Sequence, residues 1–247
     1  MALADDLIGY WKLDESSGDA VDEVNGNDAV NTGVTYTTGA LNNCADFNAA
    51  TDVLYVGNPA AVQLSGAHTV SFWLNAAAPA GLVSMIFKGG VNSAADMNWG
   101  LMKYSGGSLQ YWVSSGSGLS SVAISDANAD ADFFNSSWNH IVYQYTPSTK
   151  MEVFLNGSSY ASETTGIVSA ASTTKGLSFG RITTSQSANA RDSVIGQMDE
   201  IGIWSRVLTG AEITTLYNSG TPYSYADITG GGGGYRFVPQ LRPFAGL

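Results

Sequence analysis

The sequence predicts an all-β protein in which two antiparallel sheets pack as a sandwich, with one short helix near the C-terminal end of the domain. Short apolar stretches recur along the chain and alternate with polar residues, which is the pattern of half-buried strands. Glycine, asparagine, serine and aspartate separate these stretches and favour turns. Charged residues make up 13% of the 247 residues, below the usual level of about 25%.

The predicted strands begin with LIGYWKL at residues 7–13. In TVSFWLN, at residues 69–75, the side chains of Val70, Phe72 and Leu74 share one face because strand side chains alternate. Further strands are LVSMIFK, SLQYWV, WNHIVYQY, KMEVFLNG and GLSFGR. The dipeptide Asn156-Gly157 predicts a tight hairpin turn. Many short strands at this spacing predict a sandwich.

The predicted helix follows the last strand, in LTGAEITTLYNSG at residues 208–220. Thr209 is the N-cap and Glu212 stands three residues later, which is the spacing of a capping box. Ile213 and Leu216 lie on one helical face, and Gly220 is a stop signal. We expect this helix to lie on the edge of the sandwich.

Alternating apolar positions predict the core. The expected core residues are Trp11, Phe72, Leu74, Val153, Leu155, Ile201 and Ile203. The single cysteine, Cys44, cannot form a disulfide within the chain and is expected to be a small buried apolar residue. A net charge of −11 disfavours nucleic acid as a partner. No apolar run is long enough to span a bilayer.

Several sequence patterns occur along the chain in one order. They are GYWKLDESSGDAVDEVNGNDAV, CADFNAATDVLYV, TVSFWLN, IFKGG, WNHIVYQYTPSTKMEVFLNG, LSFGR and GQMDEIGIWSRVLTGAEITTLYNSG. Together they make the chain similar to laminin G-like jelly-roll domains of the concanavalin A-like lectin/glucanase superfamily. The resemblance implies a jelly-roll domain at residues 1–220, and leaves a Gly-rich linker at 221–234 and a tail at 235–247. The superfamily includes binding modules and enzymes, so the fold leaves the function open.

The chain lacks the catalytic pattern that the resemblance implies for glucanases, Glu-x-Asp-x-x-Glu on one strand. In GQMDEIGIW, Asp199 and Glu200 are adjacent, so strand alternation predicts that they point to opposite faces, with Asp199 on the face of Ile201. His140 is expected to be a structural strand histidine. We therefore predict no catalytic residue, and a glycoside hydrolase is the least favoured function.

The resemblance also implies one structural calcium ion, because related jelly rolls often hold such an ion at the sandwich edge. The candidate ligands are Asp22 and Asn25 in a turn-rich loop, and Asp199, since Ca²⁺ prefers carboxylate and amide oxygens. The alternative is that backbone amides satisfy Asp199 and that no ion binds. The acidic run SDANADADFF lacks the glycine and glutamate of a calcium loop and is expected to be a solvated loop.

Aromatic residues gather in MNWGLMKYSGGSLQYWVSSGSG, between polar and glycine residues. Trp99, Tyr104, Tyr111 and Trp112 are the candidate platforms for a sugar ring. Tyr111 and Trp112 are neighbours on a strand, so one of the two points inward. The alternative is that most of these rings belong to the core.

The C-terminal residues YRFVPQLRPFAGL are apolar and basic, on a chain that is otherwise acidic. Prolines 239 and 243 disfavour a helix there. The pattern predicts an extended docking peptide whose anchors are Tyr235, Arg236, Phe237, Leu241, Arg242 and Phe244. The alternative is that the tail folds back on its own sandwich.

Taken together, the sequence predicts a non-enzymatic, lectin-like module that is a structural or decoration component of a larger assembly, most plausibly a virion. Its expected partners are neighbouring subunits, bound through the tail, and a polysaccharide or cell-surface glycan. The alternative is a free-standing carbohydrate-binding lectin. The N-terminus lacks the features of a cleaved signal peptide, so the expected location is a virion, or the extracellular space after release.

Overall fold

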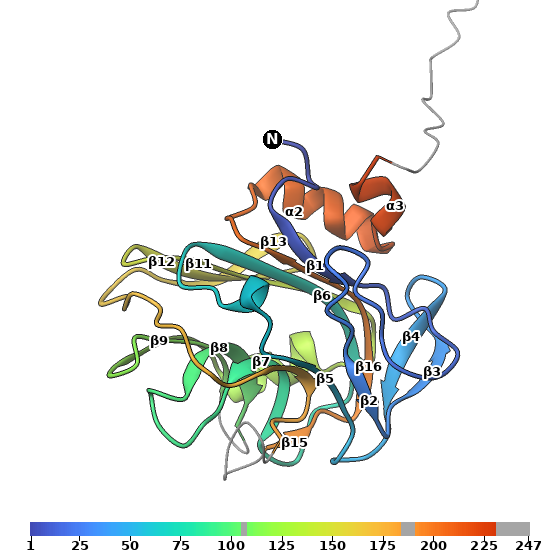
Figure 1. The fold of residues 1–247 in the computed structure, drawn as a ribbon, viewed down its shortest axis with the longest axis horizontal. Coiled ribbons are helices and arrows are strands. Elements are labelled where there is room, and N and C mark those ends of the chain that lie inside the picture. Colours follow the sequence, from blue (N-terminus) through green and yellow to red (C-terminus); the bar gives the residue numbers. More distant parts are fainter. Residues whose placement is uncertain (105–107, 184–190, 231–247) are drawn as a thin grey trace, which may run out of the picture.

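The computed structural model describes residues 1–104, 108–183 and 191–230, which form two sheets packed face to face (Figure 1). The upper sheet has the order β13 (Ser158–Glu163), β12 (Lys150–Leu155), β11 (Asn139–Thr146), β6 (His68–Ala76), β16 (Gly196–Trp204), β4 (Asn43–Phe47) and β3 (Thr35–Thr38), with β1 (Leu7–Trp11) beside β16. The lower sheet has the order β10 (Leu119–Ile124), β9 (Leu109–Ser114), β8 (Met97–Lys103), β7 (Val83–Gly89), β14 (Leu177–Gly180), β5 (Val53–Gly57) and β2 (Val30–Thr32), with β15 (Asp192–Ser193) beside β7.

The pairing confirms the predicted antiparallel sandwich of two sheets, each with eight strands in the described chain. Neighbouring strands run antiparallel, and the short pairing of β15 with β7 is parallel. Strand β6 lies between β11 and β16, so Phe72 is opposite Ile141, at the centre of the upper sheet.

The main core lies between the two sheets. It contains the expected residues Trp11, Phe72, Leu74, Val153, Ile201 and Ile203, all fully buried. Leu155 is only half-buried and packs against this core from its margin, because it stands at the end of β12. Cys44 is buried, as predicted.

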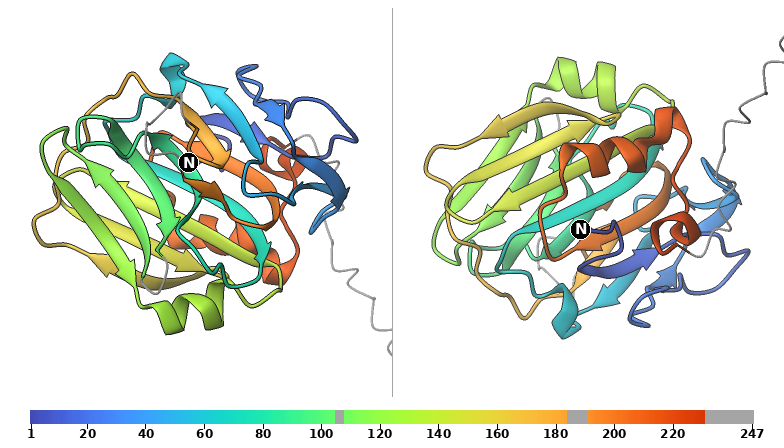
Figure 2. Two further views of the ribbon diagram at one scale, coloured as in Figure 1. Left: turned by 90° about the horizontal axis from the view of Figure 1, so that it is seen from below. Right: turned by 90° about the horizontal axis from the view of Figure 1, so that it is seen from above.

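Two helices cover the outer face of the upper sheet (Figure 2). Helix α2 (Gly210–Tyr217) begins at Thr209, which forms the predicted capping box with Glu212. Its residues Ile213 and Leu216 join Trp204 in a second apolar cluster outside the main core. The expected position of this helix at the sandwich edge was therefore wrong, since it lies across a sheet face.

The packed part of the chain continues beyond Gly220. After a 3₁₀ turn, η3 (Asn218–Gly220), helix α3 (Tyr225–Ile228) buries Ile228 in the second cluster, and the hydroxyl of Tyr225 donates to the carbonyl of Glu23 at 2.9 Å. Residues 221–230, expected to belong to a linker, therefore belong to the folded domain.

The acidic run at residues 125–134 is not a solvated loop. It forms the short helix α1 (Asp126–Asn128) and a π-helical turn, η2 (Ala129–Phe133), which buries Phe133 in the main core. Asp130 forms an ion pair of 3.0 Å with the buried Lys103. A further 3₁₀ turn, η1, spans Ala60–Val62. In the described ranges, no helix is long and apolar enough to cross a membrane.

Candidate functional site

Two of the four candidate sugar platforms belong to the main core. Trp99 on β8 and Tyr111 on β9 are fully buried between the sheets. The hydroxyl of Tyr111 lies 3.1 Å from Nε2 of His68, and the ring of Trp99 lies 5.5 Å from the same histidine. Their assignment to a sugar site was wrong, because strand alternation turns both rings inward.

The other two candidates, Tyr104 and Trp112, lie on the outside of the lower sheet. Both are half-buried, and their ring centroids are 6.5 Å apart with the planes tilted by 58°. They pack on a small apolar cluster that is separate from the main core and contains Phe87, Met97, Met102 and Ile182. We call Tyr104 and Trp112, together with this support, the aromatic face.

Polar groups surround the aromatic face. Gln110 precedes Trp112 by two residues on β9, so its side chain leaves the sheet on the same side. Within the described chain, Oε1 of Gln110 and the indole Nε1 of Trp112 have no hydrogen-bond partner. Burial raises the pKa of Tyr104, and the nearby positive charge of Arg191 acts in the opposite direction. Oε1 of Gln110 and Nε1 of Trp112 are both buried, so the face presents the two rings to solvent with a polar residue at its margin.

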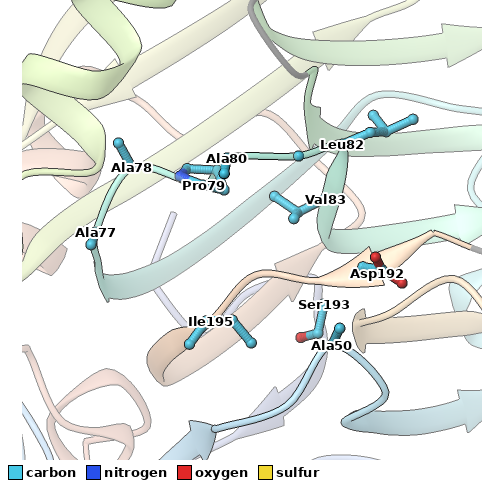
Figure 3. Close-up of a pocket in the computed structure, with 11 residues that line it drawn as sticks. Ala50, Ala77, Ala78, Pro79, Ala80, Leu82, Val83, Asp192, Ser193 and Ile195 are labelled. Atoms are coloured by element: carbon cyan, nitrogen blue, oxygen red, sulfur yellow. The ribbon is translucent and has the colours of Figure 1, made fainter.

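A pocket of about 310 Å³ lies between the loop that follows β6 and the segment around β15. Figure 3 shows the loop from Ala77 to Leu82 along one side, and Asp192, Ser193 and Ile195 along the other. Val83 also lines the pocket and pairs with Lys103, the residue before Tyr104. Val83 belongs to the main core, whereas Tyr104 packs on the small outer cluster, and none of the residues that line the pocket is aromatic. The pocket is therefore a feature separate from the aromatic face.

The acidic pair on β16 does not follow strand alternation. A β-bulge between Asp199 and Gly202 places an extra residue opposite β6, and Glu200 takes a left-handed φ of 50°. Ile201 stays in the main core, whereas Glu200 accepts a hydrogen bond from Tyr10, a member of the outer cluster. The predicted sharing of one face by Asp199 and Ile201 was therefore wrong.

Both carboxyls of this pair are buried. The amide of Leu41 donates to Oδ2 of Asp199 at 3.0 Å, while Oδ1 has no partner in the described chain. Desolvation raises the pKa of Asp199 to about 9 and that of Glu200 to about 8, against the opposing effect of these hydrogen bonds. Both groups are therefore largely protonated at neutral pH.

Two of the expected calcium ligands, Asp22 and Asn25, form hydrogen bonds within the described chain. The two carboxylate oxygens of Asp22 accept five hydrogen bonds with N···O distances of 2.9–3.2 Å. The donors are the backbone amides of Tyr10, Val24, Asn25 and Asn27, and the side-chain amide of Asn27. These donors use the lone pairs that a metal would need. The side-chain amide of Asn25 donates to the carbonyl of Ile8. In the described residues, no three His, Cys, Asp or Glu side chains converge on a metal position.

The sequence reasoning missed a buried pair of serine and histidine. Oγ of Ser71 lies 2.8 Å from Nε2 of His140, and desolvation lowers the pKa of His140 to about 3. Trp73 and Tyr217 lie against the imidazole at ring distances of 5.1 and 6.2 Å. Nδ1 of His140 has no acidic partner in the described residues. The pair is closed off from solvent, which agrees with the predicted structural role of His140.

The remaining predicted site is the tail. Tyr235, Arg236, Phe237, Leu241, Arg242 and Phe244 lie outside the described residues.

Comparisons with known proteins agree with this architecture. The model of the concanavalin A-like lectin/glucanase superfamily matches residues 47–214, more than half of the chain. No curated protein sequence matches significantly. The chain is similar to the binding domain of Paraclostridial Mosquitocidal Protein 1, with a TM-score of 0.68, 16% identity, and coverage of 88% of this chain and 53% of that one.

Two domains of botulinum neurotoxins are similar to the same extent. The receptor-binding domain of the C/D mosaic serotype has a TM-score of 0.65, 16% identity and coverage of 87% and 51%. The ligand-binding domain of serotype D, solved with N-acetylneuraminic acid, has a TM-score of 0.65, 16% identity and coverage of 88% and 52%. The chain thus spans about half the length of these domains, and the likeness is one of fold. With the sandwich and the family match in agreement, the chain belongs to the concanavalin A-like lectin/glucanase superfamily.

Proposed function

We propose that the protein is a non-enzymatic carbohydrate-binding module whose ligand lies on the aromatic face. The observation that carries this proposal is the pair of half-buried rings, Tyr104 and Trp112, on the outside of the lower sheet. Sugar rings bind to such sites because their C–H faces pack on aromatic rings while their hydroxyls take hydrogen bonds.

The polar groups of the site suit sugar hydroxyls. Gln110, two residues before Trp112 on β9, supplies a half-buried polar side chain on the same side of the sheet. The similar toxin domains are binding domains, one of them solved with a sugar acid, which supports a binding function for this fold.

The proposal is tested by screening the full chain on a glycan array and measuring affinity for the best ligand by calorimetry. Trp112→Ala should weaken binding about tenfold, in line with the loss of one aromatic contact. Tyr104→Ala should act in the same direction. The matched control is Val30→Ala, an exposed apolar residue on β2, at the opposite end of the same sheet. Binding that is unchanged in folded Trp112→Ala would refute the proposed face.

A second function is favoured by the composition of the tail. All 21 acidic residues and eight of the ten basic ones precede residue 231, whereas Arg236 and Arg242 follow it. A basic, apolar peptide complements an acidic partner surface. We therefore also propose that the protein is a subunit of a larger assembly, such as a virion, to which residues 235–247 attach it.

This second proposal is tested on particles or complexes isolated from the natural source. The intact chain should co-purify with a large particle, and a chain that lacks residues 235–247 should not. If the truncated chain is incorporated normally, the docking role of the tail is excluded, whatever the result of the glycan array.

A further inference from the structure

The pocket beside β15 is apolar and open to solvent. Ile195 lines one side of it and is 50% exposed. The loop on the other side contains three alanines, a proline and a glycine, whose small side chains leave a space of about 310 Å³ (Figure 3). Ligand sites measure about 300–1,000 Å³, so this pocket has the size for one aromatic side chain and a few atoms around it.

Asp192 supplies a negative charge at this pocket. Its side chain is exposed and takes part in none of the ion pairs found among the described residues. Ser193, the other polar residue of the lining, is buried, and its hydroxyl donates to the carbonyl of Val194 at 3.0 Å. An occupant that matches the pocket therefore combines an apolar group with a positive charge.

The tail of the chain carries that combination in Arg242-Pro243-Phe244. A proline disfavours the helical conformation of the residue before it, so Arg242 favours an extended backbone. Side chains two positions apart leave an extended peptide on the same side. The ring of Phe244 can thus enter an apolar pocket while the guanidinium of Arg242 meets a carboxylate beside it.

The tail begins far from the pocket of its own molecule. Helix α3, which ends two residues before Gly230, lies above the upper sheet, whereas β15 lies beside β7 at the opposite end of the molecule (Figure 1). Phe244 follows Gly230 by 14 residues, a length that spans at most about 46–50 Å. Much of this length would be needed to pass around the sandwich, whereas a neighbouring molecule can present its pocket directly.

We infer that the tail of one copy docks into this pocket of a second copy, with Phe244 in the apolar space and Arg242 paired with Asp192. The inference rests on the proposed attachment through residues 235–247 and names the partner as the protein itself. Because the tail and the pocket are different surfaces, the contact is heterologous and continues from copy to copy into a ring or a chain. Such a contact suits a subunit of a larger assembly.

Sedimentation of the full chain over a range of concentrations tests the inference. The wild type should associate beyond the monomer, and Phe244→Ala should weaken this association about tenfold, because it removes the buried anchor. Ile195→Ala should act in the same direction, whereas Val30→Ala, which is exposed to a similar extent, should change nothing. A monomeric wild type, or undiminished association of Phe244→Ala, would overturn the inference.

The ion pair offers a second, independent test. Asp192→Arg and Arg242→Asp should each weaken association about fivefold, since each places like charges at the contact. An equimolar mixture of the two variants should recover it, because the arginine tail of one meets the aspartate pocket of the other. Glu163→Arg, at the edge of the upper sheet, is the control for added positive charge. A mixture that associates as weakly as its components would rule out pairing between copies.

Failure of this inference differs from failure of the proposed attachment. If the chain does not associate with itself but loses its place on isolated particles without residues 235–247, the tail docks on another protein and the inference is wrong. A monomeric wild type whose melting temperature falls with Phe244→Ala would show that the tail occupies its own pocket, which also overturns it. A truncated chain that is incorporated normally would instead exclude the attachment itself.

Discussion

Asp199 and Glu200 illustrate how one backbone irregularity changes the chemistry of two side chains. The bulge adds a residue to β16, and so Ile201 remains in the main core while Glu200 turns toward Tyr10. Without water around them, both carboxyls are more stable as neutral acids, and the Tyr10–Glu200 hydrogen bond holds the second one in place. These residues thus stabilise the upper sheet in their protonated form.

The acidic pair predicts a pH-dependent stability. The pKa values of about 9 for Asp199 and about 8 for Glu200 exceed the unfolded values of 3.8 and 4.5. At a pH between the unfolded and the folded pKa values, the folded chain therefore binds more protons than the unfolded chain. The free energy of unfolding should therefore be highest below pH 4, fall as the pH rises, and level off above pH 9.

Urea unfolding at a series of pH values measures this slope. Asp199→Asn and Glu200→Gln should each flatten it, because an amide does not titrate. Glu152→Gln, whose carboxylate pairs with Lys150 at the surface, should leave the slope as it is. A wild-type slope that both amide variants retain would contradict the assignment of buried, protonated acids.

Phe72 is the second prediction at this scale. It is fully buried at the centre of β6 and contacts the ring of Tyr143 edge-on at 6.5 Å. Phe72→Ala should lower the free energy of unfolding by about 3–5 kcal/mol, because it leaves a cavity between the sheets. Val30→Ala, at an exposed position, should change it by less than about 0.5 kcal/mol. A Phe72→Ala protein that unfolds like the wild type would contradict the inward face assigned to β6.

Among the elements, helix α3 has the clearest measurable role. Tyr225 packs on Tyr10 with ring centroids 5.2 Å apart, and Ile228 is buried in the outer cluster beside Trp204. A chain that ends at residue 220 loses these contacts, whereas a chain that ends at residue 230 keeps them.

Truncation therefore locates the end of the domain. The melting temperature should fall by several degrees in a chain of residues 1–220, because a loss of about 1 kcal/mol shifts a domain of this size by about 2–4 °C. Residues 1–230 should melt like the full chain. If both truncated chains melt alike, α3 contributes nothing to stability.

At the scale of the whole molecule, we predict that the stability of the sandwich does not depend on a metal ion. Asp22 accepts hydrogen bonds from backbone amides. Among the described residues, no group of three His, Cys, Asp or Glu side chains is arranged to hold a metal ion. Addition of EDTA should thus leave the melting temperature of the full chain unchanged, and excess Ca²⁺ should not raise it. A rise with Ca²⁺ that EDTA reverses would show that an ion binds after all.

The sequence by itself determined the strands, the capped helix and the inward face of β6. These features depend on local rules, since side-chain alternation and capping are set by residues a few positions apart. It also led to the superfamily, through patterns that occur in one order. Its prediction of Tyr104 and Trp112 as the ligand platforms awaits the glycan measurements.

The tertiary structure decided the rest. The inward orientation of Trp99 and Tyr111 depends on which face of the lower sheet meets the upper one, and the pairing of neighbouring strands is not encoded within either strand. The bulge at Asp199–Gly202 appears when β16 pairs with β6, so alternation alone predicted the wrong face for Asp199. The small cluster under Tyr104 and Trp112, which includes Phe87 and Ile182, arises because segments distant in sequence meet on one sheet.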